Sequence, residues 1–335
     1  MSQPTLLGHL RARAGRTFTD AAWSVIAHAG RRLPNARPER HGVERIADVA
    51  YLETDREHHR LDVYRPVKRS GPLPIVLYIH GGGFRILSKD THWLMAIAFA
   101  RRGYLVFNIN YRLAPEHPFP AAAEDGCAAL AWVAENAARF GGDLDRLVLA
   151  GESAGANLAT SLAIATAWSR PEPWAHRAFE TGICPRAVVP ACGILQVTDV
   201  DRFARRKRLP GFLRDRLREV EDAYLPHTHP RGPARDLADP LLWLERADKP
   251  ARPLAPFFAG VGTADVLLDD TRRLKAALDR LEVPCEVRYY PGEIHAFHAM
   301  VWRPAARAYW RDTFAFLDRH VRLAAEEEEA ESVVG

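Results

Sequence analysis

The sequence predicts an α/β fold in which a mostly parallel β-sheet is covered by helices on both faces. Short apolar runs alternate along the chain with longer segments whose apolar residues have helical spacing. Of the 335 residues, 47% are apolar and 26% are charged, which is ordinary for a globular chain and too apolar for a disordered one. The length suffices for one large domain with a packed core.

The predicted elements follow one another regularly after about residue 46. Residues 46–52 and 59–66 have the pattern of a strand pair. Residues 73–79 form a continuous apolar run that ends in glycines, as a strand buried on both faces would. Further strands are expected at 104–113, 146–153, 186–197, 255–265 and 285–292, and helices at about 91–102, 120–143, 154–168 and 271–282. The sheet would then be eight-stranded.

Three segments depart from this alternation. Residues 1–45 contain an amphipathic helical stretch and eight arginines against three acidic residues, a net charge of +5. Residues 199–245 have the pattern of an insertion, and their 201–218 portion carries eight basic against two acidic residues. Residues 326–335 form an acidic tail, which lowers the overall net charge to +4.

Composition and charge exclude several classes of protein. A net charge of +4 is too small to indicate a nucleic-acid binder. No apolar run reaches the length of a membrane span, and the first residues lack the apolar stretch of a signal peptide, so a cytoplasmic protein without a stable membrane anchor is expected. The four cysteines form no C-x-x-C pair, which favours free thiols over disulfides or a zinc site: Cys127, Cys184, Cys192 and Cys285.

The most informative motif is Gly151-Glu152-Ser153-Ala154-Gly155, a G-x-S-x-G pattern between a predicted strand and a predicted helix. A sharp strand-to-helix turn would lift the Ser153 hydroxyl above the sheet, and the glycines would leave room where strand and helix approach each other. The Ala154 N–H would lie at a helix N-terminus, where it can bind developing negative charge. Ser153 is therefore the candidate nucleophile, and the alternative is a serine at an ordinary helix N-cap.

A second glycine-rich motif, His80-Gly81-Gly82-Gly83-Phe84, ends the third predicted strand. Consecutive glycines are typical where backbone approaches a ligand or adopts positive φ. In an acyl-transfer enzyme, the N–H groups of Gly82 and Gly83 would contribute to an oxyanion hole. The alternatives are a plain turn or a phosphate-binding loop, and the latter lacks its usual sequence pattern. His80 is one candidate general base, although a loop-orienting role is favoured for it.

Three motifs resemble, in their order and spacing, the hormone-sensitive-lipase-like group of α/β-hydrolases, which are the bacterial family IV esterases: HGGGF at 80–84, YRLAPEHPFPAAAED at 111–125 and GESAGANLA at 151–159. The similarity covers about residues 46–320. It departs from the family pattern at Glu152, where Asp is usual, and at Ala156, where Gly is common. Both departures leave the expected chemistry intact.

The resemblance implies an α/β-hydrolase fold with a catalytic domain at 46–325. Residues 1–45 would form N-terminal cap helices and residues 199–245 a second cap segment, and such a cap usually limits substrates to short or medium acyl chains. Because the positive charge is concentrated in these two segments, one hypothesis is a basic pocket entrance that favours neutral or anionic esters over cationic ones. The alternative is solvated arginines on exposed helices.

A serine nucleophile needs a base and an orienting acid, which follow it in the order acid, then histidine, on this fold. Asp265 comes directly after an apolar run, where its carboxylate would face the same sheet edge as Ser153. Asp269 and Asp270 follow about one helical turn later and fit the start of the next helix better. The D-x-L-x-D pattern of the family also matches at this place, with its first aspartate, Asp265, as the acid.

Two histidines, His295 and His298, are candidates for the base. His295 follows the last predicted strand in a context that resembles the catalytic loop of the family, and it is favoured, whereas His298 is expected to be structural. His227 and His229 form an H-x-H pair in a loop with prolines. Because no further ligand residues stand at suitable spacing, this pair is expected to be solvated rather than to bind a metal.

These residues together predict a serine carboxylesterase that works through an acyl-enzyme. Ser153, Asp265 and His295 would form the triad, and the oxyanion hole would consist of Gly82, Gly83 and Ala154. The reaction requires no cofactor and no metal, and the expected partner is a small-molecule ester; a homodimer is left open. The alternatives are a non-catalytic ligand-binding homologue, which would be expected to lack the base, and a lipase for longer acyl chains.

Overall fold

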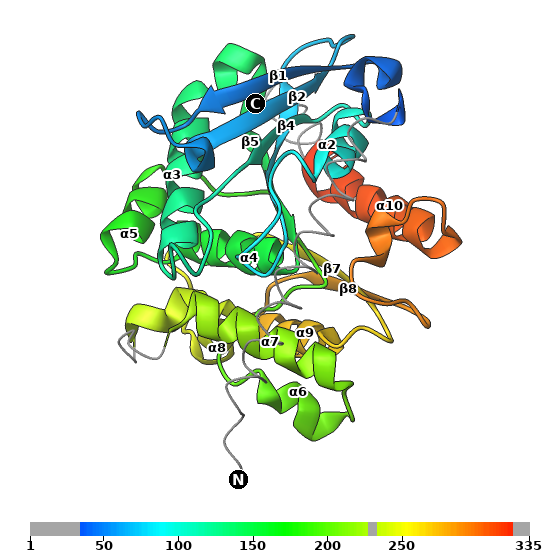
Figure 1. Cartoon of the computed structure of the whole chain (residues 1–335). Helices are drawn as coiled ribbons and strands as arrows, with labels where there is room; N and C mark the ends of the chain where they lie inside the picture. The colour runs from blue at the N-terminus through cyan, green and yellow to red at the C-terminus, as the bar shows by residue number, and fades with distance from the viewer. Residues whose placement is uncertain (1–33, 227–232, 324–335) are drawn as a thin grey trace.

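The computed structural model describes residues 34–226 and 233–323 (Figure 1). The predicted N-terminal helix before residue 34, the His227/His229 pair and the acidic tail at 326–335 lie outside the described residues. Most of the predicted domain at 46–325 and of its second cap segment lies inside them.

An eight-stranded sheet forms the centre of the molecule, with strand order β1-β2-β4-β3-β5-β6-β7-β8. Within the described chain only β2 runs antiparallel to its two neighbours, and all other pairs are parallel. The strands are β1 (Val43–Ala50), β2 (Arg60–Pro66), β3 (Leu73–Ile79), β4 (Leu105–Ile109), β5 (Gly142–Glu152), β6 (Ala187–Ala191), β7 (Phe257–Gly262) and β8 (Cys285–Tyr290). The predicted α/β fold with a mostly parallel sheet of eight strands is confirmed.

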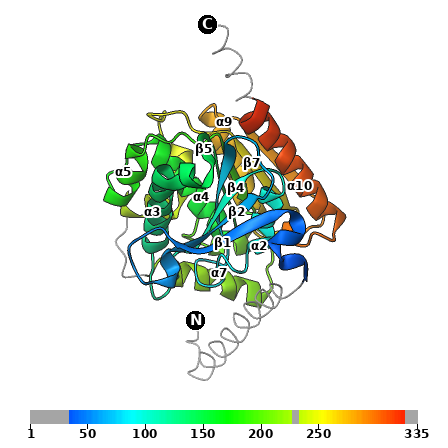
Figure 2. The ribbon, with the colours of Figure 1, turned by 90° about the horizontal axis from the view of Figure 1, so that it is seen from above.

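Helices cover both faces of the sheet, which Figure 2 shows from above. One face packs against α3 (Ala121–Asn136), α4 (Ala154–Ala167), α5 (Pro173–Glu180), α8 (Pro240–Arg246) and α9 (Leu268–Arg280), and the other against α2 (Trp93–Ala100) and α10 (Pro304–Leu317). Side chains of a strand alternate between the two layers: in β3, Ile75 and Leu77 belong to the first core, and Val76 and Tyr78 to the second. Both layers are therefore held by the same buried strands.

Short helical turns connect the main elements. They are η1 (Pro34–Ala36), η2 (Pro38–His41), η3 (Glu57–His59), η4 (Ala137–Phe140), η5 (Pro233–Ala238), η6 (Phe297–Ala299) and η7 (Asp318–Leu323). Among the described residues, no helix combines the length and apolar character needed to cross a lipid bilayer.

The predicted insertion contains α6 (Asp201–Arg206) and α7 (Gly211–Tyr224), followed by η5 and α8. The predicted strand at 186–197 is shorter than expected, because β6 ends at Ala191 and the chain then turns at Cys192, whose φ is +37°. Residues after this turn lead into the insertion. The end of β6 therefore connects the carboxyl ends of the strands to the helices of the insertion.

Candidate active site

Ser153 occupies a strained turn between β5 and α4. Its φ of 53° and ψ of −115° are unusual for a residue other than glycine. A Cβ atom on Gly155 would lie 2.0 Å from the carbonyl oxygen of Ile79, and one on Gly151 would lie 2.4 Å from that of Gly155. The two glycines are therefore required where strand and helix cross, as the motif predicts.

The end of β6 holds the Ser153 backbone from one side. The Ser153 N–H donates to the carbonyl oxygen of Ala191 at 2.9 Å, and the Ile194 N–H donates to the carbonyl oxygen of Ser153 at 3.3 Å. These two bonds offset part of the conformational cost of the turn.

Asp265 and His295 reach Ser153 from neighbouring strands. Asp265 follows β7 and His295 follows β8, and these two strands are parallel neighbours whose carboxyl ends lie at one edge. His295 Nε2 lies 3.0 Å from Ser153 Oγ, and His295 Nδ1 lies 2.9 Å from Asp265 Oδ2. The other Asp265 oxygen accepts the Leu267 N–H at 2.9 Å. The three candidate residues thus lie in one line of hydrogen bonds.

The electrostatic environment stabilises the imidazolium that forms when His295 accepts a proton. Burial alone would lower the pKa of His295, but the neighbouring Asp265 carboxylate and the Cys192 thiol outweigh it and raise this pKa well above its usual value. The Asp265 side chain is fully buried, whereas that of His295 is 39% exposed. The site can therefore stabilise an imidazolium and still admit a substrate.

The glycine-rich loop adopts a conformation that other residues would resist. Gly82 has a φ of 116° and Gly83 a φ of 60°, and a Cβ atom on Gly82 would lie 2.0 Å from the carbonyl oxygen of Ile86. Within the described chain, no backbone hydrogen bond outside the helices and strands engages the N–H of Gly82, Gly83 or Ala154.

The two alternative candidates for the base, His80 and His298, have other contacts. His80 is buried, stacks on Tyr111 with ring centroids 4.2 Å apart, and places Nδ1 2.7 Å from the carbonyl oxygen of Gly81. Burial lowers the pKa of His80 to about 3, so it is neutral. His298 lies in η6, and its Nε2 is 2.6 Å from Glu152 Oε2. Both contacts agree with the orienting and structural roles expected of them.

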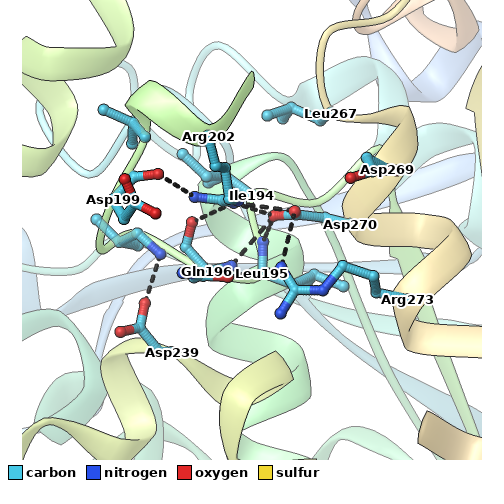
Figure 3. A network of polar contacts seen from close by, with 12 residues as sticks. Ile194, Leu195, Gln196, Asp199, Arg202, Asp239, Leu267, Asp269, Asp270 and Arg273 are labelled. Atoms are coloured by element: carbon cyan, nitrogen blue, oxygen red, sulfur yellow. Dashed lines mark hydrogen bonds and ion pairs between the residues drawn. The ribbon is translucent and has the colours of Figure 1, made fainter. Parts of the chain in front are cut away.

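Asp269 and Asp270 belong to the first turn of α9, as expected. Asp270 also makes buried contacts with the insertion. Its carboxylate is fully buried, accepts the N–H groups of Leu195 and Gln196, and pairs with Arg202 at 2.8 Å (Figure 3). Asp270 therefore ties the insertion to the segment that supports Ser153.

The hypothesis of a basic pocket entrance finds little support in the insertion. Five of the eight basic residues at 201–218 pair with carboxylates: Arg202 with Asp270, Arg205 with Asp199, Arg206 with Asp269, Arg216 with Glu219, and Arg218 with Asp201. Their positive charge is thus largely compensated locally.

Sequence reasoning missed the roles of His92, Cys192 and Arg202. His92 Nε2 lies 2.8 Å from Glu152 Oε1, and Cys192 lies beside the triad. No motif contains these residues. The one signal for His92 was that it directly precedes an apolar segment, where an unpaired polar side chain would be costly, whereas Arg202 stands in a charged segment and carried no such signal.

The ligand atoms of Cys192, Asp265 and His295 all lie within 4.8 Å of one another, the one such group of three among residues 34–226 and 233–323. Asp265 and His295 are already hydrogen-bonded to each other beside Ser153. This cluster therefore belongs to the same site and does not form a separate metal centre.

Comparisons with known proteins agree with this geometry. Residues 76–299 match a family described as the alpha/beta hydrolase fold. A carboxylesterase, NlhH, of Mycobacterium tuberculosis is 40% identical over 148 residues, which are 44% of this chain and 46% of that protein. An acetyl esterase of Salmonella schwarzengrund is 32% identical over 225 residues, 67% of this chain and 65% of that protein. The chain thus spans about half to two thirds of the length of these relatives.

Among solved structures, esterase B from Lactobacillus rhamnosis has the same fold, with a TM-score of 0.75 and 21% identity over 96% of this chain and 97% of that one. The family match covers more than half of the chain, including the Ser153, Asp265 and His295 turns. The chain therefore belongs to the α/β-hydrolase fold family, and the resemblance of its motifs to the hormone-sensitive-lipase-like group of esterases is confirmed.

Proposed function

We propose that the protein is a serine carboxylesterase that hydrolyses carboxylic esters through an acyl-enzyme. The observation that carries this proposal is the line of contacts from Asp265 through His295 to Ser153, with distances of 2.9 Å and 3.0 Å. The esterase names of the relatives support the same class of reaction. The reaction itself needs no cofactor or metal, and the partner is a small-molecule ester.

The mechanism follows from the two contacts. His295 Nε2 takes the proton of Ser153 Oγ as this oxygen attacks the ester carbonyl carbon. The N–H groups of Gly82, Gly83 and Ala154 bind the oxyanion, and Asp265 stabilises the imidazolium. The imidazolium then returns its proton to the departing alcohol, which leaves an ester of Ser153. A water molecule, deprotonated by His295, attacks this ester, and the imidazolium returns the proton to Ser153 Oγ as the acid is released.

The substitution Ser153→Ala tests the nucleophile. Activity on p-nitrophenyl acetate should fall by at least about 10³-fold, while the thermal unfolding midpoint stays close to that of the wild type. The control is Ser169→Ala, because Ser169 is an exposed serine just beyond α4. Unchanged turnover in Ser153→Ala would refute the assignment.

A phosphonate inhibitor separates an enzyme from a ligand-binding homologue of the same fold. An esterase should be labelled once per chain at Ser153, and mass spectrometry of the digested protein would locate the label. A binding homologue that lacks an activated serine would remain unlabelled. The control is the Ser153→Ala variant, which should not react.

We propose that the enzyme prefers short to medium acyl chains. The basis for this proposal is the set of contacts made by α7. This helix lies directly against the glycine-rich loop: a Cβ atom on Gly83 would be 2.8 Å from Val220 Cγ2, and the rings of Phe84 and Tyr224 stack at 3.7 Å. Arg85 pairs with Glu219 at 3.3 Å. Helix α7 thus packs on this loop, and the acetyl esterase among the relatives supports the same preference.

A series of p-nitrophenyl esters from acetate to palmitate tests this preference. The value of kcat/KM should be highest for short chains and fall steeply for long ones. Val220→Ala, which removes two methyl groups beside Gly83, should shift the optimum to longer chains. A flat profile, or the same profile in both proteins, would count against the contribution of α7.

A further inference from the structure

Behind the triad lies a buried carboxylate that the esterase mechanism does not use. Glu152 precedes Ser153, is 7% exposed, and contacts two imidazoles, His92 at 2.8 Å and His298 at 2.6 Å. A carboxylate at this depth would be unfavourable without such partners. Glu152 and His298 therefore form a buried pair that joins the turn of the nucleophile to the loop that carries His295.

Cys192 lies between this pair and the triad. It follows β6, is fully buried, and donates its backbone N–H to the carbonyl oxygen of Gly260 at 3.1 Å. Its Sγ atom lies within 4.8 Å of a ring nitrogen of His295 and of a carboxylate oxygen of Asp265. Its thiol also interacts with the imidazole of His298. The sulfur thus lies beside the His295 ring and interacts with the His298 imidazole as well.

The position is not that of an ordinary core cysteine. Cys192 has a φ of +37°, a conformation that costs free energy for any residue other than glycine, so the backbone here is held by its surroundings. The neighbouring Ala191 carbonyl accepts the Ser153 N–H. Burial would raise the pKa of the Cys192 thiol, but the two histidines lower it. The hydroxyl groups of Tyr78 and Tyr309 are the other titratable groups that face this sulfur.

We propose that Cys192 is a positioning residue for the general base: its thiol supports the His295 ring and connects it to the buried Glu152–His298 pair. This inference rests on the proposed function. In the reaction, the proton moves from Ser153 Oγ to His295 Nε2, and Cys192 neither gains nor loses one. The sulfur is a weak acceptor beside the ring, so it stabilises the imidazolium and restricts the movement of the ring.

The test compares Cys192→Ala, Cys192→Ser and Cys127→Ala. Cys127 is an equally buried thiol on α3, away from the site, and serves as the matched control. In Cys192→Ala we expect kcat to fall about 3- to 10-fold, the range for loss of one neutral hydrogen bond, with KM within about twofold. The acid limb of kcat/KM should move to lower pH, because the imidazolium loses a stabilising neighbour.

Cys192→Ser should recover most of the lost kcat and the original acid limb, since its hydroxyl can also accept a hydrogen bond. Cys127→Ala should leave both the acid limb and kcat unchanged. The proposal is overturned if Cys192→Ala keeps the wild-type acid limb and kcat, or if its kcat loss occurs equally in Cys127→Ala. If Cys192→Ala does not fold, Cys192→Gly, which suits the positive φ at this position, replaces it in the comparison with Cys192→Ser.

A double-mutant cycle tests the connection to the Glu152–His298 pair. His298→Gln and Cys192→Ala should lower kcat by less in combination than the product of their separate effects, because both act on His295 through the same contact. Multiplicative effects would overturn the connection. Labelling by the phosphonate should persist in every variant. If Ser153 is not labelled in the wild type either, the proposed function fails rather than the role of Cys192.

Discussion

Two buried carboxylates near the Ser153 turn, Glu152 and Asp270, are held by different partners. Glu152 lies between the imidazoles of His92 and His298, whereas Asp270 pairs with the guanidinium of Arg202 and accepts two backbone N–H groups. A guanidinium stays charged at every relevant pH, but an imidazole does not. We call the region of Asp270 and Arg202 the cap side and the region of Glu152 and His298 the elbow side. The cap side is held by a permanent charge, and the elbow side by the His298 imidazole, whose charge depends on pH.

The largest effect is expected on the cap side. Arg202→Ala leaves the buried Asp270 carboxylate without its cation and should lower the free energy of unfolding by about 3–5 kcal/mol, measured by urea denaturation. The matched control lies on the same helix, where the exposed pair of Arg205 and Asp199 should contribute nothing measurable. Equal midpoints for Arg202→Ala and Arg205→Ala would contradict this contrast.

A smaller effect is expected on the elbow side. Glu152→Gln keeps the shape of the side chain but removes its charge, and it should lower the free energy of unfolding by about 1–3 kcal/mol, because two imidazoles lose a charged acceptor. Glu135→Gln, on the exposed face of α3, is the control. Esterase activity should fall with the Glu152 substitution, since this carboxylate joins the Ser153 turn to the His295 loop. A fully stable and active Glu152→Gln would show that the charge has no role.

The smallest expected difference between the two sides is how their contribution to Tm changes at alkaline pH. The Glu152 carboxylate and the Cys192 thiol outweigh burial and raise the pKa of His298 from 6.5 to about 10. A raised histidine pKa contributes stability that is fully present below pH 6.5 and is lost as the pH rises to 10. The Tm difference between wild type and His298→Gln should therefore be largest near pH 6 and shrink towards pH 10.

The Arg202–Asp270 pair serves as the reference, because its contribution to Tm should not be lost as the pH rises. The Tm difference between wild type and Arg202→Ala should stay constant or grow from pH 7 to 10, because burial raises the pKa of Asp270 and its carboxylate becomes more costly at high pH once the guanidinium is absent. A His298→Gln difference that is equally constant would mean that this imidazole is neutral in the folded protein.

Much of the site was predictable because its signals are local. Only glycine fits without strain at the positive φ of Gly82 and Gly83 and at the close crossing of Gly151 and Gly155. Glycines at such spacing can be recognised in a sequence. The position of Asp265 followed from the end of an apolar strand. Such features depend on a few neighbouring residues, so the pattern alone indicates them.

The supporting contacts were not predictable because they join distant parts of the chain. His92 and Glu152 are 60 residues apart, Arg202 and Asp270 are 68 apart, and each pair meets only when the sheet is assembled. The basic segment at 201–218 illustrates the limit, since its composition indicated a charged surface whereas the fold pairs five of its cations with carboxylates.

The sequence by itself determined the order of strands and helices, the turn that carries Ser153 and the identity of the residues that meet there. These depend on periodicity, on turn chemistry and on chain order, which are properties of short segments. Only the tertiary structure decided which buried charge meets which partner, and that Cys192 lies beside His295. Partner choice depends on how separate segments pack, because the cost of burying a polar group is set by what surrounds it in space and not by its neighbours along the chain.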